Sequence, residues 1–342
     1  MKRNATIRDV AARAQVSTQT VSRVVNGRPD VAEETRSRVW EVIGELNYHP
    51  NAIARSLIQQ RSLALGVVTA GLRFLGPSQT LNGIAFQAEE LGYSLLLKEL
   101  PDFQATDIGP LLDTLLARQV EGIIWAVPEI GDNRSWLRPQ FENPSVPTIF
   151  LTMEARPGVS IVSVDNYQGG RMATEHLIRQ GYQHIGHITG PLDWWEARQR
   201  LRGWQDALRD AGRPAEDRYW AGGNWSAASG AQEIEHLLDS YPEMDALFAA
   251  NDQMALGVQQ VAAQRRIRIP DDLAVVGFDG IPESAYYWIP LTTVYQDFSA
   301  LGSAAVRELI SMVEENEPDH EGVKPRQTSL QPELIVRASS GG

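Results

Sequence analysis

Apolar residues near the start of the chain recur at the three- and four-residue spacing of a helix face. A first stripe consists of Ile7, Val10, Ala11 and Ala14, and Thr6 can cap it, with Asp9 three residues later. Ser17 restarts the chain after a short break, and a second stripe follows at Val16, Val21, Val24 and Val25. A third helix is predicted from about Ala32 to Leu46. Two capped helices separated by a short break are typical of a helix-turn-helix that lays its second helix in the DNA major groove.

From Leu63 onward, short apolar runs alternate with longer helical stretches. Strands are predicted at 63–69, 93–98, 121–127, 148–151, 160–164, 184–190, 246–252 and 273–279. Helices are predicted at 79–91, 107–118, 170–179, 194–211, 226–238 and 253–264, and three of them should stop at Gly92, Gly181 and Gly212. The alternation indicates two doubly wound α/β lobes with a ligand cleft at the carboxyl ends of their parallel strands.

Between these regions, residues 51–61 have room for only about two turns of helix, which is marginal in isolation. One interpretation is a passive linker whose Leu57 packs on the body. The other is a hinge that orders on DNA, with Ala54 and Leu57 on one side, and with Leu57 as a wedge in the minor groove.

Charge separates the two ends of the chain. Residues 1–61 have a net charge of +4, whereas residues 62–342 have a net charge of −16. Phosphate would repel so acidic a body, so DNA contact should be confined to the N-terminal segment. On the second helix, the side chains that point away from its apolar stripe are polar. Gln can pair with adenine, Arg with guanine, and a Thr methyl group can touch thymine. These outward residues are Thr18, Gln19, Ser22, Arg23 and Asn26.

Composition narrows the class of protein further. The chain has 342 residues, no cysteine, no apolar run of membrane-spanning length and no export segment. We therefore expect a cytoplasmic, multi-domain protein that is not inserted in a membrane. His184 and His187 are predicted to lie in one strand, where their offset points them to opposite faces, so we interpret them as structural. No metal, cofactor or catalytic residue is expected.

Several blocks resemble the lactose repressor (LacI) family over essentially the whole chain. They are TIRDVAARAQVSTQTVSRVVNG, LNYHPNAIARSL, GPLDWWEARQRLRGW, GNWSAASG, AANDQMALG, VVGFDG and IPLTTVYQDF. The resemblance implies an all-α helix-turn-helix headpiece, a hinge helix, and a two-lobed core like that of periplasmic binding proteins. It also implies a homodimer on a pseudo-palindromic operator.

The domain boundaries follow from this comparison. The headpiece is expected at 1–49 and the hinge at 50–61. The N-terminal lobe is expected at 62–164 plus about 295–325, and the C-terminal lobe at 165–294 plus about 326–338.

The family's functional positions are carried over residue by residue. Its base readers fall on Thr18, Gln19 and Arg23, and its minor-groove leucine falls on Leu57, which favours the hinge interpretation. The full set of predicted DNA contacts is Thr6, Ser17, Thr18, Gln19, Thr20, Ser22, Arg23, Asn26, Ala54 and Leu57. The family's effector contacts fall on Arg200, Trp225, Asn251, Asp279, Gln296 and Phe298.

These effector positions suit a neutral sugar, because directed polar groups can bind hydroxyls while aromatic rings cover apolar ring faces. Structural roles remain open for three of them. Asp279 could end a strand, Asn251 could cap the following helix, and Trp225 could belong to the core.

Departures from the family pattern change the expected ligand. Thr152 stands where the family's namesake has an aspartate, and a small polar loop there is replaced by Trp194, Trp195 and Glu196. The added indole surface would either stack on a second sugar unit or shrink the pocket. Phe74, with Gly76 and Pro77, is expected at the opposite rim. The predicted effector set is Phe74, Thr152, Trp194, Glu196, Arg200, Trp225, Asn251, Asp279, Gln296 and Phe298.

The predicted function is therefore a repressor that a mono- or disaccharide glycoside releases from its operator. An alternative within the same class is a corepressor-dependent regulator that senses a purine or a phosphorylated sugar, although acidic Glu196 and Asp279 disfavour an anion. A transport binding protein would not need the N-terminal DNA reader. An enzyme is disfavoured because the sequence lacks a phosphate-binding loop, a nucleophile elbow and a metal constellation. No coiled-coil tail follows ELIVRASSGG, so dimers are expected.

Overall fold

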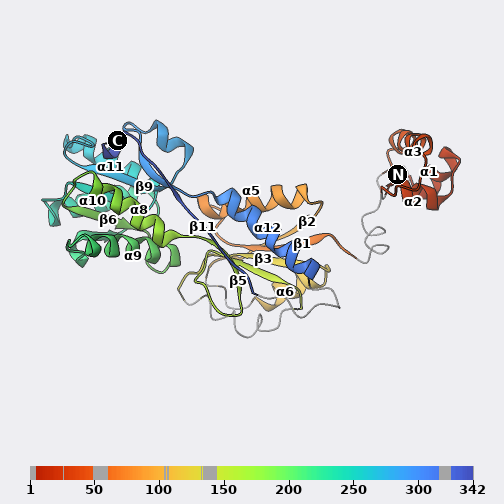
Figure 1. The fold of residues 1–342 in the computed structure, drawn as a ribbon, viewed down its shortest axis with the longest axis horizontal. Helices are drawn as coiled ribbons and strands as arrows, with labels where there is room; N and C mark the ends of the chain where they lie inside the picture. Colours follow the sequence, from red (N-terminus) through yellow and green to blue (C-terminus); the bar gives the residue numbers. More distant parts are fainter. Residues whose placement is uncertain are drawn as a thin grey trace. The chain divides into compact units, whose positions relative to one another are not determined.

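The computed structural model describes residues 5–25, 27–48, 61–103, 105, 108–131, 133, 145–315 and 325–341. The chain divides into two compact units, Met1–Leu63 and Ala64–Gly342 (Figure 1). Most of the predicted hinge, including Ala54 and Leu57, lies outside the described residues, and so does Asn26. Within the described part of the chain, no helix is both long and apolar enough to cross a membrane.

The first unit is a three-helix headpiece made of α1 (Ile7–Ala14), α2 (Thr18–Val25) and α3 (Glu33–Glu45). Thr6 and Asp9 cap α1 reciprocally, and the Ser17 hydroxyl accepts the Thr20 amide at the start of α2, at 3.0 Å. The predicted stripes meet in one small core formed by Val10, Ala11, Ala14, Val21, Val24, Val39, Val42 and Ile43. The predicted helix-turn-helix is confirmed.

The second unit contains two six-stranded sheets, one in each lobe. The first sheet has the parallel order β11 (Gln327–Leu330), β5 (Ser160–Val164), β4 (Thr148–Leu151), β3 (Gly122–Ala126), β1 (Ala64–Thr69) and β2 (Ser94–Glu99). Its helices are α5 (Leu75–Glu90), α6 (Gly109–Leu116) and α12 (Phe298–Glu315). Figure 1 shows α12 alongside α5, although the two are far apart in sequence.

The second sheet has the order β12 (Glu333–Ile335), β10 (Thr292–Tyr295), β9 (Ala274–Asp279), β8 (Ala246–Ala249), β6 (Ile185–Thr189) and β7 (Trp220–Gly222). Only β12 runs antiparallel to its neighbour among the described strands of this sheet. Its helices are α8 (Asn166–Arg179), α9 (Trp195–Asp210), α10 (Ala227–Ser240) and α11 (Asp252–Arg265). Short 3₁₀ turns lie at Asp217–Tyr219, Pro282–Tyr286 and Ala338–Ser340.

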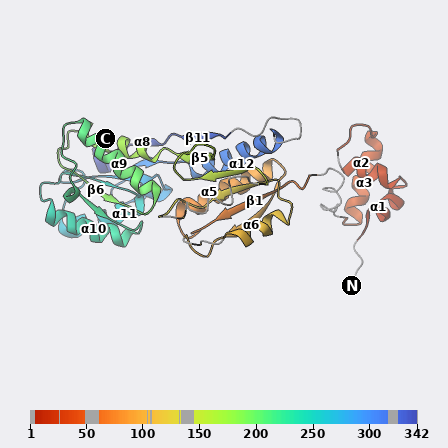
Figure 2. The same cartoon turned by 90° about the horizontal axis from the view of Figure 1, so that it is seen from below.

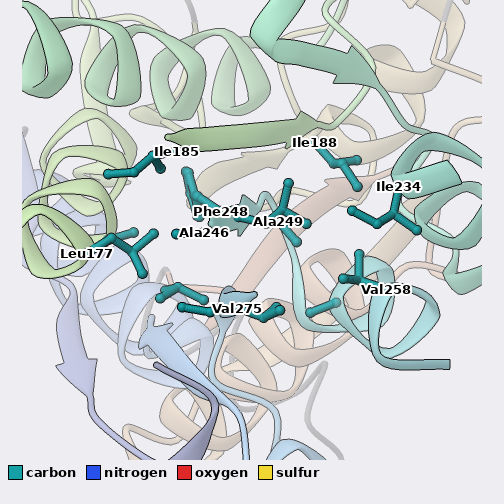
Figure 3. Close-up of a cluster of buried hydrophobic side chains, with 14 of the residues drawn as sticks. Leu177, Ile185, Ile188, Ile234, Ala246, Phe248, Ala249, Val258 and Val275 are labelled. Carbon is teal, nitrogen blue, oxygen red and sulfur yellow. The ribbon is translucent and has the colours of Figure 1, made fainter. Parts of the chain in front are cut away.

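The core of the second lobe lies between its sheet and the flanking helices. Figure 3 shows strand residues such as Ile188, Phe248 and Val275 meeting Leu177, Ile234 and Val258 from the helices. Continuous apolar strands of this kind are expected in parallel sheets covered on both faces. The predicted α/β fold of two doubly wound lobes is confirmed.

The chain crosses between the lobes three times, after β5, β10 and β11 (Figures 1 and 2). The predicted boundary at about 326 is wrong, because residues 327–330 pair with β5 in the first sheet and only β12 joins the second. The pairing partner, which is distant in sequence, decides where this segment belongs.

Sequence reasoning missed β7, β10, β11, β12 and α12 as elements. It also placed the start of α5 too late, at 79 instead of Leu75, because Pro77 was taken as part of a loop. Proline is tolerated in the first helical turn, where no amide needs an internal partner, and Pro77 lies there. The predicted helix stops at Gly92, Gly181 and Gly212 are confirmed by positive φ angles.

Glycines bring α8 and α9 into backbone contact. A Cβ atom at Gly170 would lie 2.4 Å from the Arg200 carbonyl oxygen, and one at Gly203 would lie 2.3 Å from the Tyr167 oxygen. Only glycine permits so close an approach. This packing fixes the height of Arg200 on α9 relative to the start of α8.

His187 on β6 is fully buried and is a structural residue, as predicted. Its Nδ1–H donates to the Phe248 carbonyl at 2.7 Å, and its ring stacks on the Phe248 ring. Burial lowers the pKa of His187 to about 3, and nearby Arg200 adds to this shift, while the hydrogen bond to the carbonyl opposes it. The native state therefore holds this imidazole neutral.

We predict that His187 makes the protein less stable in acid. Below the unfolded pKa of about 6.5, the unfolded chain binds a proton that the native state refuses, so stability falls by about 1.4 kcal/mol per pH unit towards pH 3. Urea unfolding of the wild type and of His187→Gln, from pH 4 to 8, should give a stability difference that shrinks with this slope below pH 6.5. A difference that is independent of pH would contradict the assignment.

Candidate functional site

A cavity of about 290 Å³ lies between the two lobes of the second unit. Its walls come from segments that follow the carboxyl ends of strands in both sheets, which is where parallel α/β sheets bind ligands. All ten residues of the predicted effector set line it: Phe74, Thr152, Trp194, Glu196, Arg200, Trp225, Asn251, Asp279, Gln296 and Phe298. The tertiary structure thus brings together side chains that span more than 200 positions of the sequence.

Arg200 organises the polar end of this cavity from the second turn of α9. Its Nε donates to Asn166 Oδ1 at 2.8 Å, and its Nη1 donates to the Ala250 carbonyl. The same Nη1 lies 3.4 Å from Asp279 Oδ1, and the guanidinium covers the Phe278 ring at 3.8 Å. The side chain is 6% exposed, so its charge depends on these partners.

Asp279 ends β9 and completes the ion pair. Its Oδ1 also accepts the Gln296 side-chain amide at 2.7 Å. Burial is the largest influence on both charges: it raises the pKa of Asp279 and lowers that of Arg200, and their mutual attraction opposes both shifts. The predicted structural role, ending a strand, and a position in the cavity wall are thus both realised by this residue.

Asn251 likewise has a structural role inside the cavity wall. It is the N-cap of α11, and its Oδ1 accepts the Met254 amide at 2.8 Å. Its Nδ2 donates to the Trp225 carbonyl at 3.0 Å, which ties the loop before α10 to the start of α11. One amide proton of Asn251 is left for another acceptor.

Aromatic rings form another part of the cavity wall. Trp194 is only 9% exposed. Its ring meets those of Phe74, Phe103 and Trp225 edge-on, with centroids 5.2 to 5.8 Å apart. Phe74 and Phe103 belong to the first lobe, while Trp194 and Trp225 belong to the second. The cluster therefore connects the lobes at one side of the cleft.

Backbone hydrogen bonds reinforce this connection. The Gly131 amide donates to the Asp193 carbonyl at 2.8 Å, and the Trp195 amide donates to the Glu129 carbonyl at 3.0 Å. These two bonds flank an antiparallel bridge between Ile130 and Trp194. We call this pairing of 129–131 with 193–195 the clasp.

The Glu129 side chain anchors the clasp and is fully buried. Its carboxylate pairs with Arg156 at 2.7 Å within the first lobe, and it lies 3.8 Å from Arg198 of α9 in the second. Sequence analysis missed Glu129, because a single glutamate after a strand looks like a solvated loop residue. Only the fold shows that two arginines converge on it.

Glu196 stands beside the clasp, in the first turn of α9. The residue is 8% exposed, and its Oε2 has no hydrogen-bond partner. Burial raises the pKa of Glu196 to about 7, Glu129 pushes it the same way, and Arg200 and Arg198 oppose the shift. The Glu196 backbone amide also lowers this pKa by a hydrogen bond to the carboxyl. A buried carboxyl with a raised pKa and one oxygen lacking a partner indicates a candidate functional group.

Three residues of the cavity wall have a left-handed backbone conformation. Thr152, Trp225 and Asp279 have φ angles of 58°, 70° and 102°, and all three line it. Left-handed backbone at non-glycine residues costs about 1–3 kcal/mol each and is typically kept at functional sites. Gly190 makes room for one of them, because a Cβ there would lie 2.1 Å from the Trp225 ring.

Some residues of the cavity wall were not predicted. Asn166, which orients Arg200, and Gln253, whose Oε1 has no hydrogen-bond partner, both line it. Their positions in the sequence could have indicated them. Asn166 follows a strand in SIVSVDN, and Gln253 follows Asn251 at a helix start. Asn224 and Ser226 flank Trp225 in the same wall.

The headpiece presents the predicted base readers on α2. Thr18, Gln19 and Arg23 are exposed, whereas Thr20 and Ser22 are half-buried. Thr6 and Ser17 act as helix caps in the structure, at the N-termini of α1 and α2. The remaining predicted contacts, Asn26, Ala54 and Leu57, lie outside the described residues.

No cluster of three or more metal-ligating side chains occurs among the residues that the structure describes. The His184 ring lies 3.3 Å from the Tyr241 hydroxyl, and His187 lies in the core. The burial of His187 agrees with the structural role predicted for it.

Both parts of the chain are similar in sequence to known protein families. Residues 6–51 match the family described as bacterial regulatory proteins, lacI family, and residues 174–340 match the periplasmic binding protein-like domain. The lactose operon repressor of Escherichia coli (strain K12) is 36% identical over 308 residues, 90% of this chain and 84% of that protein. The chain belongs to the LacI family of bacterial regulatory proteins.

Other similarities to this LacI-family chain extend over its whole length. The transcriptional repressor PurR of Glaesserella parasuis serovar 5 (strain SH0165) is 33% identical over 337 residues, which cover 98% of both chains. The crystal structure of the lac repressor dimer bound to operator and the anti-inducer ONPF superposes with a TM-score of 0.83. It is 34% identical and covers 99% of each chain. These relatives are transcriptional repressors with a DNA-binding helix-turn-helix and a ligand-binding core.

We predict that Gly190→Ala disturbs the cavity of this LacI-family protein by displacing the Trp225 ring. Overpacking of this kind costs about 1–3 kcal/mol, so chemical unfolding should show a loss of that size together with altered tryptophan fluorescence. Gly222→Ala is the matched control, because a Cβ at Gly222 meets nothing within 4 Å. Equal stability and fluorescence in the two variants would contradict the proposed contact.

Proposed function

We propose that this LacI-family protein is a homodimeric repressor that a neutral sugar, a mono- or disaccharide glycoside, releases from a pseudo-palindromic operator. The observation that carries the proposal is the convergence of all ten predicted effector residues on one cavity between the lobes. Helix-turn-helix residues that are exposed on α2 supply the DNA-reading surface.

The chemistry of the cavity favours an uncharged ligand. The positive charge of Arg200 is balanced by Asp279. The other charged side chains of the lining are Arg73 and Glu196, so the two signs are equal in number and the cavity offers an anion no excess of positive charge. Hydroxyl groups can bond to the polar end, while the rings of Phe74, Trp225 and Phe298 cover apolar ring faces.

Large apolar side chains on the surface of the second unit support self-association. Tyr286 and Trp288 are 88% and 89% exposed, and Phe86 on α5 is 64% exposed. Exposed aromatics of this size typically mark protein contacts. A second copy of this chain would cover these side chains. The resulting dimer would present two headpieces, as a two-fold symmetric operator requires.

Release follows from linkage between the two binding events. In this proposal, the sugar binds one lobe arrangement more tightly than the other, and that arrangement disfavours the simultaneous grip of two headpieces on one duplex. The hinge predicted at 50–61, with Leu57 as its wedge, is the connecting segment that would fold on operator.

The direct test is to measure operator binding with and without sugars. Duplexes selected from a random pool by the full-length protein should contain two inverted half-sites. A panel of neutral mono- and disaccharides should contain at least one member that both raises the thermal midpoint and weakens binding to that duplex. A ligand that instead tightens binding would mark a corepressor, and the proposal of sugar induction would be wrong.

We predict that Gln19→Ala reduces sequence discrimination rather than general DNA affinity. Loss of a bidentate base contact costs about 1–3 kcal/mol on the selected duplex, while the salt dependence should stay the same because phosphate contacts are retained. Fluorescence anisotropy on selected and scrambled duplexes over a salt series measures both quantities. Ser37→Ala, on the exposed side of α3, is the control. An equal loss on both duplexes would remove Gln19 from base recognition.

A further inference from the structure

The headpiece carries an acidic side chain on the loop that follows α2. Asp30 Oδ2 lies 3.4 Å from Nη1 of Arg23, and the two side chains are 54% and 49% exposed. DNA phosphates repel a carboxylate, so an acid beside the helix that presents the base readers lowers general affinity for DNA. An acid in this place therefore needs a role that offsets the repulsion.

Asp30 differs from an acid that serves the local fold. Asp9 closes the capping box at the start of α1, where its carboxylate accepts the Thr6 amide. The N-cap of α3 is Ala32, two residues after Asp30, so the Asp30 carboxylate is available to Arg23. The ion pair links a side chain of α2 to the loop between α2 and α3.

The loop that carries Asp30 is held against α2 by bonds of its own. The Arg28 amide donates to the Arg23 carbonyl at 2.9 Å, and Arg36 on α3 donates to the Arg28 carbonyl at 2.9 Å. Val31, directly after Asp30, packs on the core of the headpiece. The fold therefore fixes the carboxylate near Arg23, and the ion pair does not have to order the loop.

We propose that Asp30 is a positioning residue for base recognition, which orients the Arg23 guanidinium for a base edge and keeps it from backbone phosphates. The inference rests on the proposed function, in which Arg23 reads DNA, and adds a residue outside the recognition helix. A guanidinium has five N–H donors, so a bond from Nη1 to Asp30 leaves donors for O6 and N7 of guanine. A side chain that is already oriented also loses less rotamer freedom on binding.

The pair should act mainly when DNA is bound. An exposed ion pair contributes little to folding stability, because water screens both charges. An interface with DNA displaces that water, and the attraction between Asp30 and Arg23 becomes stronger. A phosphate would have to compete with Asp30 for the guanidinium and would be repelled by it, whereas a guanine edge is uncharged. Asp30 therefore disfavours non-specific binding more than specific binding.

The test measures the affinity of the full-length protein for the selected duplex and for a scrambled duplex. For Asp30→Asn, we expect the ratio of the two Kd values, scrambled over selected, to fall about fivefold, because part of an arginine–guanine contact is lost. On the scrambled duplex, the salt dependence should steepen by about 0.9 in log–log slope as Arg23 gains a phosphate. Asp30→Glu, which keeps the charge on a longer side chain, should restore part of the ratio.

Two controls show whether Asp30 acts through Arg23. Glu34→Gln removes an exposed carboxylate from the first turn of α3 and should leave the Kd ratio unchanged. In the Arg23→Ala background, Asp30→Asn should also leave the ratio unchanged. Substitution of each base pair of the half-site in turn should show that Asp30→Asn and Arg23→Ala lose discrimination at the same base pair.

The outcomes separate this inference from the proposed function. If the protein selects a duplex with inverted half-sites but Asp30→Asn keeps the wild-type ratio, the positioning role is wrong and the repressor proposal stands. The role is also wrong if Asp30→Asn lowers the ratio equally with and without Arg23, or at a different base pair. If the wild-type protein selects no duplex, the proposed function itself fails. Thermal unfolding shows whether each variant is folded, and if Asp30→Asn is not, the same measurements with Asp30→Ser decide the question.

Discussion

A guanidinium that is removed from water is the constraint on which the site depends. Arg200 retains its charge inside the second lobe only because Asp279, Asn166 and the Ala250 carbonyl surround it. Those partners come from the ends of different strands, so the ion pair fixes the spacing of the strand ends. The close contact of α8 with α9 through Gly170 and Gly203 sets the height of the arginine. The packing of this lobe therefore holds its side of the cavity wall in place.

The clasp provides a second constraint, of a different kind. It joins the lobes through backbone hydrogen bonds and through edge-on aromatic contacts around Trp194. Glu129 adds electrostatic attraction between the lobes, because its buried carboxylate faces arginines from both of them. A change in lobe arrangement has to act on these contacts, which lie directly beside Glu196. The contacts between the lobes and the wall of the cavity consequently meet at the start of α9.

Local sequence patterns were sufficient to predict much of the fold. Helix stripes and caps predicted the headpiece, because its core is made by residues close together in sequence. The resemblance to the LacI family then placed ten residues that meet in one cavity. What failed was non-local: the partner of β11, which overturned the boundary at 326, and the start of α5 at Leu75. Glu129 was missed because its importance comes entirely from Arg156 and Arg198, which are distant in the chain.

The sequence by itself determined the order of most helices and strands, the all-α headpiece followed by two α/β lobes, and the side chains available for chemistry. Periodicity, capping and turn residues act over a few positions, so they can be read along the chain. Only the tertiary structure decided which of those side chains have all their hydrogen-bonding atoms satisfied and which do not. Asn251 and Glu196 look alike as polar residues near helix starts, yet one is bonded to its own lobe and the other is buried with an oxygen that lacks a partner. Hydrogen-bond satisfaction depends on atoms from distant segments, and folding alone brings them together.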